Sequence, residues 1–469
     1  MNANKNLIKI ISLVAAVGLL AGCSSPAATS TQTPALPAST SAEFDELIPL
    51  ATAFVEQLAQ GEYTAATTRF DASMQNVLPA AKLEETWEQV LGQVGAYQHQ
   101  LGTHTDELQG YRRVFVTTQF EKAVLDVLVV FDAQGQIAGL FFQPVQAPDA
   151  TPQAYNPPEY VHNGSFHEIE VTVGKGEWAL PGTLTLPEGD APFPAVVLVH
   201  GSGPNDRDET IGPNKPFRDL AWGLASQGIA VLRYDKRTKV HGTKFTPELG
   251  AKLTVKEETI DDALLAAQLL RETESIDPQH VFVAGHSLGA YLAPRIGLAD
   301  PDLAGLIILA GPTRPMEDLI LDQITYLNHL DGTLTDQEKS DLEALQGQVD
   351  RVKDANLSAE VASTDLPLGI PPAYWLDLRD YQPVEVAKTL AMPLLVVQGG
   401  RDYQVSAEKD FSGWETALAG KANATLMLYP ELNHLLIAGK GPSTPEEYGV
   451  EGHVSGEVIQ DIAGWVEQQ

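Results

Sequence analysis

The apolar positions in the first part of the chain follow a helical period and then change to a strand period. Residues Glu43–Leu58, Tyr63–Phe70 and Ala80–Leu91 carry apolar side chains at helical spacing, although Pro49 predicts a delayed start for the first helix. Helices followed by an antiparallel sheet predict a small α+β domain over residues 44–146. Its four strands are expected at Gly95–Leu101, Arg112–Phe120, Ala123–Phe131 and Ile137–Phe142, with a hairpin turn at Asp132–Gly135.

A different pattern begins near residue 161, after a proline-rich segment at residues 147–160 that is typical of a linker. Two strands are predicted at Phe166–Val173 and Glu177–Leu186, and short continuous apolar runs then alternate with amphipathic helices. Such runs are buried on both faces, so they predict a mostly parallel sheet with helices on both sides over residues 161–469. The runs are Ala195–Val199, Ile229–Leu232, His280–Ala284, Leu306–Leu309, Leu394–Val397 and Thr425–Tyr429.

One connection in this second part is much longer than a single crossover requires. About 80 residues separate Gly311 from Met392, whereas most connections between elements are short. The segment contains a helical pattern at Met316–Leu327 and a second one that opens at Thr335. We therefore expect a helical lid at about residues 312–390.

The N-terminus has the pattern of a targeting segment. Lys5 and Lys9 precede an apolar run of 11 residues, Ile10–Leu20, which is shorter than the ~20 residues that span a bilayer. The run ends at Cys23, the only cysteine in the chain, so no disulfide can form within it. Residues 1–23 resemble a bacterial lipoprotein signal, which implies cleavage before Cys23, lipid modification of its thiol, and attachment to the extracytoplasmic side of the cell membrane.

The N-terminal pattern has one alternative interpretation, which is an ordinary secretory signal with an incidental cysteine. Residues 24–43 are rich in Ser, Thr, Ala and Pro, as expected for a flexible linker between an anchor and a folded domain.

Composition excludes one class of partner. The formal net charge is −32 over 469 residues, and no basic stripe offsets it, which argues against nucleic-acid binding. We interpret the acidic surface as solubilising. No metal-ligand cluster, phosphate-binding glycine loop or cofactor motif stands out in the sequence, so we expect neither metal nor cofactor.

The segment Gly285-His286-Ser287-Leu288-Gly289 lies between a predicted strand and a predicted helix. A G-x-S-x-G sequence in this context forms a sharp turn that exposes the serine hydroxyl at the sheet edge. Serine is a poor nucleophile at neutral pH and needs a base, which in turn needs an acid to orient it. Ser287 is therefore the candidate nucleophile.

Two later loops supply the base and the acid in the order Ser, acid, His. Asp402 follows the run Leu394–Val397, and His434 follows the next strand, 32 residues further on. A surface carboxylate is the alternative reading of Asp402, and His453 is the competing base. We prefer His434 because it directly follows its strand.

The oxyanion of an acyl-transfer reaction needs backbone donors. His200-Gly201-Ser202-Gly203-Pro204 follows the strand ending at Val199, and Ser202 is our candidate donor, with Gly201 as the alternative. Leu288, directly after the nucleophile, is the second donor. The charged residues nearby are expected to form structural networks rather than to take part in catalysis. They are Asp206, Arg207, Asp208 and Arg218, and Arg233, Asp235 and Arg237.

The motifs H-G-S-G-P, G-H-S-L-G, G-G-R-D and L-N-H together make residues 161–469 resemble bacterial α/β-hydrolase esterases. The similarity is to the dienelactone-hydrolase-like and serine-aminopeptidase-like branches with a lid before the acid. It implies the α/β-hydrolase fold and a serine mechanism. Dienelactone hydrolases typically use a cysteine nucleophile, whereas this chain has serine. The N-terminal domain resembles a domain of unknown function that precedes such hydrolases, and its pattern is similar to cystatin or nuclear-transport-factor folds.

We accordingly expect a serine hydrolase that cleaves small-molecule carboxylic esters, preferably short-chain ones, through Ser287, His434 and Asp402. The lid and the aromatic pair Tyr374 and Trp375 are expected to form the acyl pocket. A peptidase or amidase acting on small peptides or cell-wall fragments would use the same triad. A binding lipoprotein with an inactive hydrolase fold is a third possibility, and a complete triad argues against it.

Overall fold

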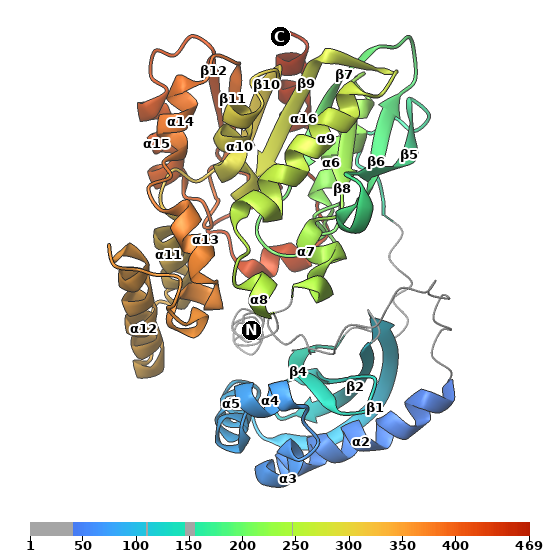
Figure 1. Ribbon diagram of the computed structural model, residues 1–469, viewed down its shortest axis with the longest axis vertical. Coiled ribbons are helices and arrows are strands. Elements are labelled where there is room, and N and C mark those ends of the chain that lie inside the picture. Colours follow the sequence, from blue (N-terminus) through green and yellow to red (C-terminus); the bar gives the residue numbers. More distant parts are fainter. Residues whose placement is uncertain (1–40, 109–110, 146–154, 246) are drawn as a thin grey trace. The chain divides into compact units, whose positions relative to one another are not determined.

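The computed structural model describes residues 41–108, 111–145, 155–245 and 247–469 (Figure 1). The predicted signal segment, including Cys23, lies outside the described residues. The described residues divide into two compact units, one within residues 41–145 together with residues 243–245 and 247–250, and the other within residues 155–242 and 251–469. Within the described ranges, no helix combines the length and the apolar character needed to cross a membrane.

Among the described residues 41–145, helices are followed by a four-stranded antiparallel sheet in chain order. The apolar faces of the helices pack on one face of the sheet around Phe54, Phe70, Trp87 and Phe120. The helices are α2 (Ser41–Ala59), α3 (Tyr63–Thr67), α4 (Ala72–Val77) and α5 (Ala80–Val94), and the strands are β1 (Tyr97–Leu108), β2 (Tyr111–Phe120), β3 (Val124–Phe131) and β4 (Ile137–Pro144).

Two expectations for this unit are wrong. Helix α2 begins at Ser41 and continues through Pro49, so the proline does not delay its start. Strand β1 continues past Leu101 to Leu108, because β-bulges near His99 and Gly102 shift its register and break the regular alternation. The hairpin turn forms as predicted, with the Asp132 carboxylate accepting bonds from two backbone N–H groups of the turn.

The second unit is built on an eight-stranded, mostly parallel sheet in the order β12-β11-β10-β9-β7-β8-β6-β5. Neighbouring strands from β12 to β8 run parallel, whereas β6 and β5 are antiparallel to their neighbours. The strands are β5 (Phe166–Val173), β6 (Leu180–Pro187), β7 (Phe193–Val199), β8 (Ala230–Tyr234), β9 (Ile276–His286), β10 (Gly305–Leu309), β11 (Leu394–Gly399) and β12 (Ala424–Tyr429).

Helices cover both faces of this sheet, as the continuous apolar runs predict. Helices α6 (Pro216–Ala225) and α16 (Gly456–Val466) pack on one face. The other face is covered by α9 (Asp261–Arg271), α10 (Leu288–Ala299), α14 (Pro383–Thr389) and α15 (Ser412–Ala417). Short helical segments complete the unit at α7 (Arg237–Val240) and the π-helical turn η3 (Lys256–Ile260), whereas α8 (Pro247–Gly250) belongs to the first unit.

The long connection between β10 and β11 is helical. It contains α11 (Met316–Asn328), α12 (Asp336–Lys353) and α13 (Pro372–Leu378) before α14. Thr335 caps α12, with its side chain accepting from the Glu338 N–H and the Glu338 side chain accepting from the Thr335 N–H. The segment has an apolar core of its own, which includes Ile320, Leu345 and Trp375.

Candidate catalytic site

The candidate residues lie at one edge of the second sheet. Strands β7, β9, β11 and β12 belong to its parallel part, so their carboxyl ends share that edge. The loop after β7 carries Gly201 and Ser202, and Ser287 directly follows β9. Asp402 follows β11, and His434 follows β12. The topology therefore places loops that are distant in sequence in one region.

Ser287 occupies a strained turn between β9 and α10, with φ 53° and ψ −113°. Neither flanking glycine, Gly285 or Gly289, has room for a side chain. A Cβ on Gly285 would lie 2.2 Å from the Gly289 carbonyl oxygen, and a Cβ on Gly289 would lie 2.3 Å from the Val199 carbonyl oxygen. The turn leaves the Ser287 side chain partly exposed at the N-terminus of α10, where the helix dipole favours negative charge.

His434 and Asp402 form a buried pair. The Nδ1 of His434 lies 2.8 Å from Oδ2 of Asp402. Oδ1 of Asp402 accepts from the backbone N–H groups of Gln404 and Val405 at 2.8 and 2.9 Å, and Oδ2 also accepts from Nε2 of Gln398 at 3.0 Å. Because Nδ1 of His434 faces a carboxylate oxygen, the neutral tautomer with its proton on Nδ1 donates to Asp402 and leaves Nε2 as the acceptor.

His453, the competing base, is engaged elsewhere. Its Nδ1 lies 3.1 Å from Oδ1 of Asp219, a buried carboxylate that also accepts from the Val454 N–H and the Tyr155 hydroxyl. The hydrogen bond to Asp219 raises the pKa of His453. The geometry thus pairs His434, and not His453, with the predicted acid.

The loop after β7 lies against the nucleophile. A Cβ placed on Gly201 would be 3.2 Å from Cβ of Ser287. The Gly201 N–H already donates to Oε1 of Glu209 at 2.6 Å, which leaves Ser202 as the better candidate of the two for an oxyanion donor. Leu288 is the first residue of α10, where backbone N–H groups have no partner within the helix.

Glu209 and His286 are functional candidates that the sequence did not indicate. The Nδ1 of His286 lies 2.8 Å from Oε2 of Glu209, and its Nε2 donates to the His434 carbonyl oxygen at 2.9 Å. Burial lowers the pKa of His286, but the Glu209 carboxylate outweighs burial and the pKa is raised overall. For the carboxyl group of Glu209, burial acts in the opposite direction and raises the pKa. The contacts with His286 and the Gly201 N–H outweigh burial and bring the pKa of Glu209 below its ordinary value. This pair connects the loop after β7 with the loop that carries His434.

A second buried ion pair, between Lys236 and Glu258, lies beside the same loop. The Nζ of Lys236 donates to the Gly201 carbonyl oxygen at 2.8 Å and lies 2.8 Å from Oε1 of Glu258. Lys236 follows β8 at the carboxyl edge of the sheet, which is a signal that sequence reasoning could have used. No comparable signal marks Glu209, whose placement depends on a positive φ of 50°.

Of the expected pocket residues, Tyr374 is half-buried and Trp375 is buried. The Tyr374 hydroxyl donates to Oε2 of Glu258 at 2.7 Å, and burial raises its pKa well above the ordinary value. Trp375 is 2% exposed in the core of the helical connection, and its Nε1 donates to the Ile370 carbonyl. Both side chains therefore have partners within the protein, and their role as an acyl pocket stays a prediction.

The charged residues around the loop form ion pairs, as expected. Asp208 pairs with Arg218 at 2.7 Å and with the buried Arg233. Arg207 pairs with Asp235 at 3.0 Å. Arg237 was expected to form a network with Arg233 and Asp235, but it pairs with Asp262 of α9 instead.

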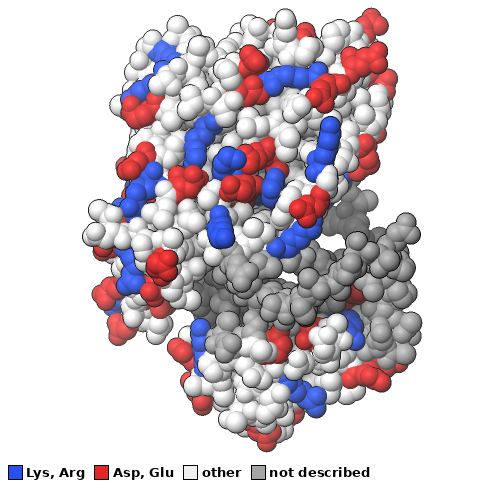
Figure 2. All heavy atoms as spheres, viewed as in Figure 1, with Lys and Arg blue, Asp and Glu red and all other residues white. Residues whose placement is uncertain are grey.

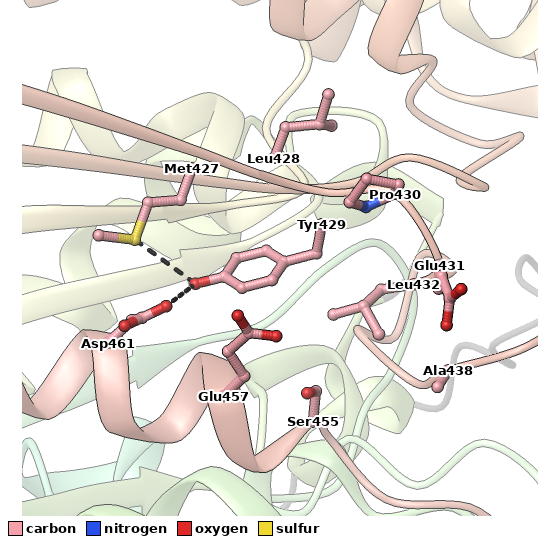
Figure 3. Close-up of a pocket in the computed structure, with 10 residues that line it drawn as sticks. All are labelled: Met427, Leu428, Tyr429, Pro430, Glu431, Leu432, Ala438, Ser455, Glu457 and Asp461. Atoms are coloured by element: carbon pink, nitrogen blue, oxygen red, sulfur yellow. Dashed lines mark hydrogen bonds between the residues drawn. The ribbon is translucent and has the colours of Figure 1, made fainter.

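A cavity of about 510 Å³ lies at the free edge of the sheet, away from the predicted catalytic side chains. Figure 3 shows it between β12 and α16, where the Tyr429 hydroxyl donates to Asp461. Its lining includes Leu428, Glu431 and Glu457, and includes none of Ser287, Asp402 and His434. Among the described residues, no group of three or more His, Cys, Asp or Glu side chains could hold a metal ion.

The surface of the second unit mixes both signs of charge. On the face shown in Figure 2, basic and acidic side chains are interspersed. Ion pairs of this unit, such as Arg295 with Asp377 at 3.2 Å, bring opposite charges together.

Comparison with known families matches two regions of the chain. Residues 190–440 match the family described as serine aminopeptidase, S33. Residues 51–140 match a family described as a protein of unknown function, DUF3887. These matches confirm the two resemblances drawn from the motifs and from the N-terminal pattern.

Individual proteins are also similar to the chain. Esterase EstD of Thermotoga maritima is 40% identical over 414 residues, which cover 88% of this chain and 93% of the relative. Esterase FrsA of Klebsiella pneumoniae is 28% identical over 200 residues, covering 40% of this chain and 42% of the relative. Among solved structures, Est1E from Butyrivibrio proteoclasticus is 14% identical with a TM-score of 0.42, covering 64% of this chain and 99% of that one.

Proposed function

The chain belongs to the family described as serine aminopeptidase, S33, and from this premise we propose that it is a carboxylic ester hydrolase that works through Ser287, His434 and Asp402. The name of the 40% identical relative, an esterase that matches along almost its whole length, supports ester substrates over peptides. The buried His434–Asp402 pair, at the same sheet edge as the strained Ser287 turn, carries the assignment of residues.

The geometry supports a two-step acyl transfer. The Ser287 hydroxyl attacks the ester carbonyl while Nε2 of His434 takes its proton. The resulting oxyanion accepts bonds from the N–H groups of Ser202 and Leu288. His434 then returns the proton to the departing alcohol, leaving an acyl group on Ser287. Water, deprotonated by His434, releases the acid and restores the serine.

A fluorophosphonate probe tests this mechanism directly. The wild-type protein should be labelled, and Ser287→Ala should lose both labelling and about 10⁶-fold in kcat, with an unchanged circular dichroism spectrum. Retained labelling in Ser287→Ala would move the nucleophile to another residue.

A panel of substrates tests the preference for esters over amides and the preferred length of the acyl chain. The family description also fits a peptidase with the same triad. We expect p-nitrophenyl acetate or butyrate to exceed both p-nitrophenyl palmitate and aminoacyl p-nitroanilides in kcat/KM. Higher kcat/KM on the anilides would establish the peptidase instead.

We further propose that the protein is anchored by a lipid on Cys23, on the extracytoplasmic side of the cell membrane. The support is the sequence of residues 1–23 described above. Cys23→Ser should shift the protein from the membrane pellet to the soluble fraction. A mutant that still sediments with membranes would contradict the anchor.

A further inference from the structure

Gly201 is held on both sides by buried charged side chains. Its N–H donates to Oε1 of Glu209 at 2.6 Å, and its carbonyl oxygen accepts from Nζ of Lys236 at 2.8 Å. Glu209 and Lys236 are each 2% exposed. Burying a cation and an anion is costly for the fold unless each is compensated, so their convergence on one glycine of a loop calls for an explanation.

The planarity of the peptide bond gives that explanation. The Gly201 carbonyl and the Ser202 N–H belong to one rigid trans peptide unit and point in opposite directions. A contact that fixes the carbonyl therefore fixes the direction of the N–H. Within the part of the chain that the structure describes, the Ser202 N–H has no protein acceptor, as an oxyanion donor requires.

The charge on Lys236 adds to this orientation. An ammonium on the carbonyl oxygen polarises the peptide and makes its N–H a stronger donor. The Asn205 side chain also donates to the Gly201 oxygen, at 3.2 Å, but it is neutral and its contact is longer. Lys236 therefore provides the stronger electrostatic contact.

Lys236 is itself held in place by a chain of contacts. Glu258 pairs with it through Oε1 at 2.8 Å and accepts from the Tyr374 hydroxyl through Oε2 at 2.7 Å. Glu258 lies in η3, and Tyr374 lies in α13 of the connection before β11. Tyr374 is thus linked to the site through Glu258 and Lys236.

We propose that Lys236 is a positioning residue that orients and polarises the Gly201–Ser202 peptide so that the Ser202 N–H meets the oxyanion. The inference rests on the proposed function of Ser202 in ester hydrolysis. Lys236 does not touch the substrate and acts through the peptide unit alone.

The test compares two adjacent ion pairs. Lys236→Met alone would leave the Glu258 carboxylate buried without its cation, which lowers the stability of the fold. The decisive variant is therefore Lys236→Met with Glu258→Gln. The matched control is Arg237→Met with Asp262→Asn. It removes a neighbouring ion pair, 12% and 2% exposed at its two side chains, that makes no contact with Gly201.

With p-nitrophenyl butyrate as substrate, the Lys236 and Glu258 double variant should lose at least about tenfold in kcat, while KM changes less than threefold. Removing an oxyanion donor lowers kcat by about 10²–10³-fold, and displacing the donor should cost part of that loss. A trifluoromethyl ketone, which forms an oxyanion on the serine, should bind more weakly by the same factor as the loss in kcat/KM. Inhibition by butyrate should not change. The control should keep kcat within twofold, even where its melting temperature falls.

Two results would overturn the inference. One is a folded Lys236 and Glu258 double variant with wild-type kcat and wild-type affinity for the ketone. The other is an equal loss of kcat in the Arg237 and Asp262 control, which would indicate general destabilisation. Ser287→Ala is measured in parallel to separate the two proposals. If Ser287→Ala remains active, the proposed function itself is refuted. If Ser287→Ala is inactive but the Lys236 and Glu258 double variant remains fully active, only this inference is refuted.

Discussion

Replacing Asp402 with asparagine tests how the catalytic base is oriented. In the wild-type protein the carboxylate accepts four hydrogen bonds, of which the one from Nδ1 of His434 fixes the tautomer. In Asp402→Asn the amide oxygen can keep the two backbone donors, and the NH₂ group then faces His434. The imidazole accepts that bond only by carrying its proton on Nε2, where it can no longer act as a base.

The expected loss is large in rate and small in stability. A wrong tautomer of this kind lowers kcat by about 10⁴-fold, equivalent to about 5 kcal/mol in the activation free energy. Stability should fall by about 1–3 kcal/mol, because one charged acceptor is lost while Gln398 keeps its bonds to the carbonyls of Gly399 and Val405. KM should change little.

The assay is steady-state hydrolysis of p-nitrophenyl butyrate, with thermal unfolding measured on the same samples. Asp410→Asn is the matched control, because the Asp410 side chain, like that of Asp402, is 0% exposed, but it bonds to Thr313 and Arg314 and to no catalytic candidate. The control should lose stability and keep kcat. If Asp402→Asn retains more than a tenth of the wild-type kcat, another group orients His434 and the reasoning from the tautomer is refuted.

Three further outcomes follow from the contacts. Gly289→Ala should prevent correct folding, seen as loss of soluble protein or of a cooperative thermal transition, because its Cβ would meet the Val199 carbonyl oxygen at 2.3 Å. His453→Gln should keep kcat and lower the melting temperature, since His453 bonds to Asp219 and not to the triad; inactivity of a folded variant would transfer the base to His453. The raised pKa of His286 means that its pairing stabilises the fold fully below about pH 6.5 and that this contribution is lost as the pH rises through the folded-state pKa. His286→Gln should therefore flatten the loss of melting temperature between pH 7 and 9, and an unchanged slope would contradict the pairing.

The sequence predicted the sheet well because its strands are short, continuous and apolar. Runs such as Ala195–Val199 and Leu306–Leu309 have few alternatives to a buried parallel strand. The pairing of Asp402 with His434 was also accessible, because both residues directly follow strands whose carboxyl ends must share an edge. Local pattern and topology agree at these positions.

Other features depend on contacts that no local pattern records. Aromatic residues near a site can line a pocket or fill a core, and the fold places Tyr374 on Glu258 and Trp375 in the core of the connection. The end of β1 was missed because bulges break the alternation from which strands are read. Glu209 reaches Gly201 only through a backbone conformation that glutamate seldom adopts.

The glycines of the nucleophile turn also determine the geometry of the oxyanion donors. Gly289 lies where α10 approaches the end of β7. A Cβ on this residue would lie 2.3 Å from the Val199 carbonyl oxygen and 2.8 Å from the His200 carbonyl oxygen. The close approach that allows the turn therefore also places the β7 loop against Ser287. Once the backbones are this near, the direction of one peptide unit decides whether Ser202 can serve the oxyanion. We therefore infer that close packing sets the distance between Ser287 and the proposed donor, Ser202, and that the buried charges on Gly201 set the donor's direction.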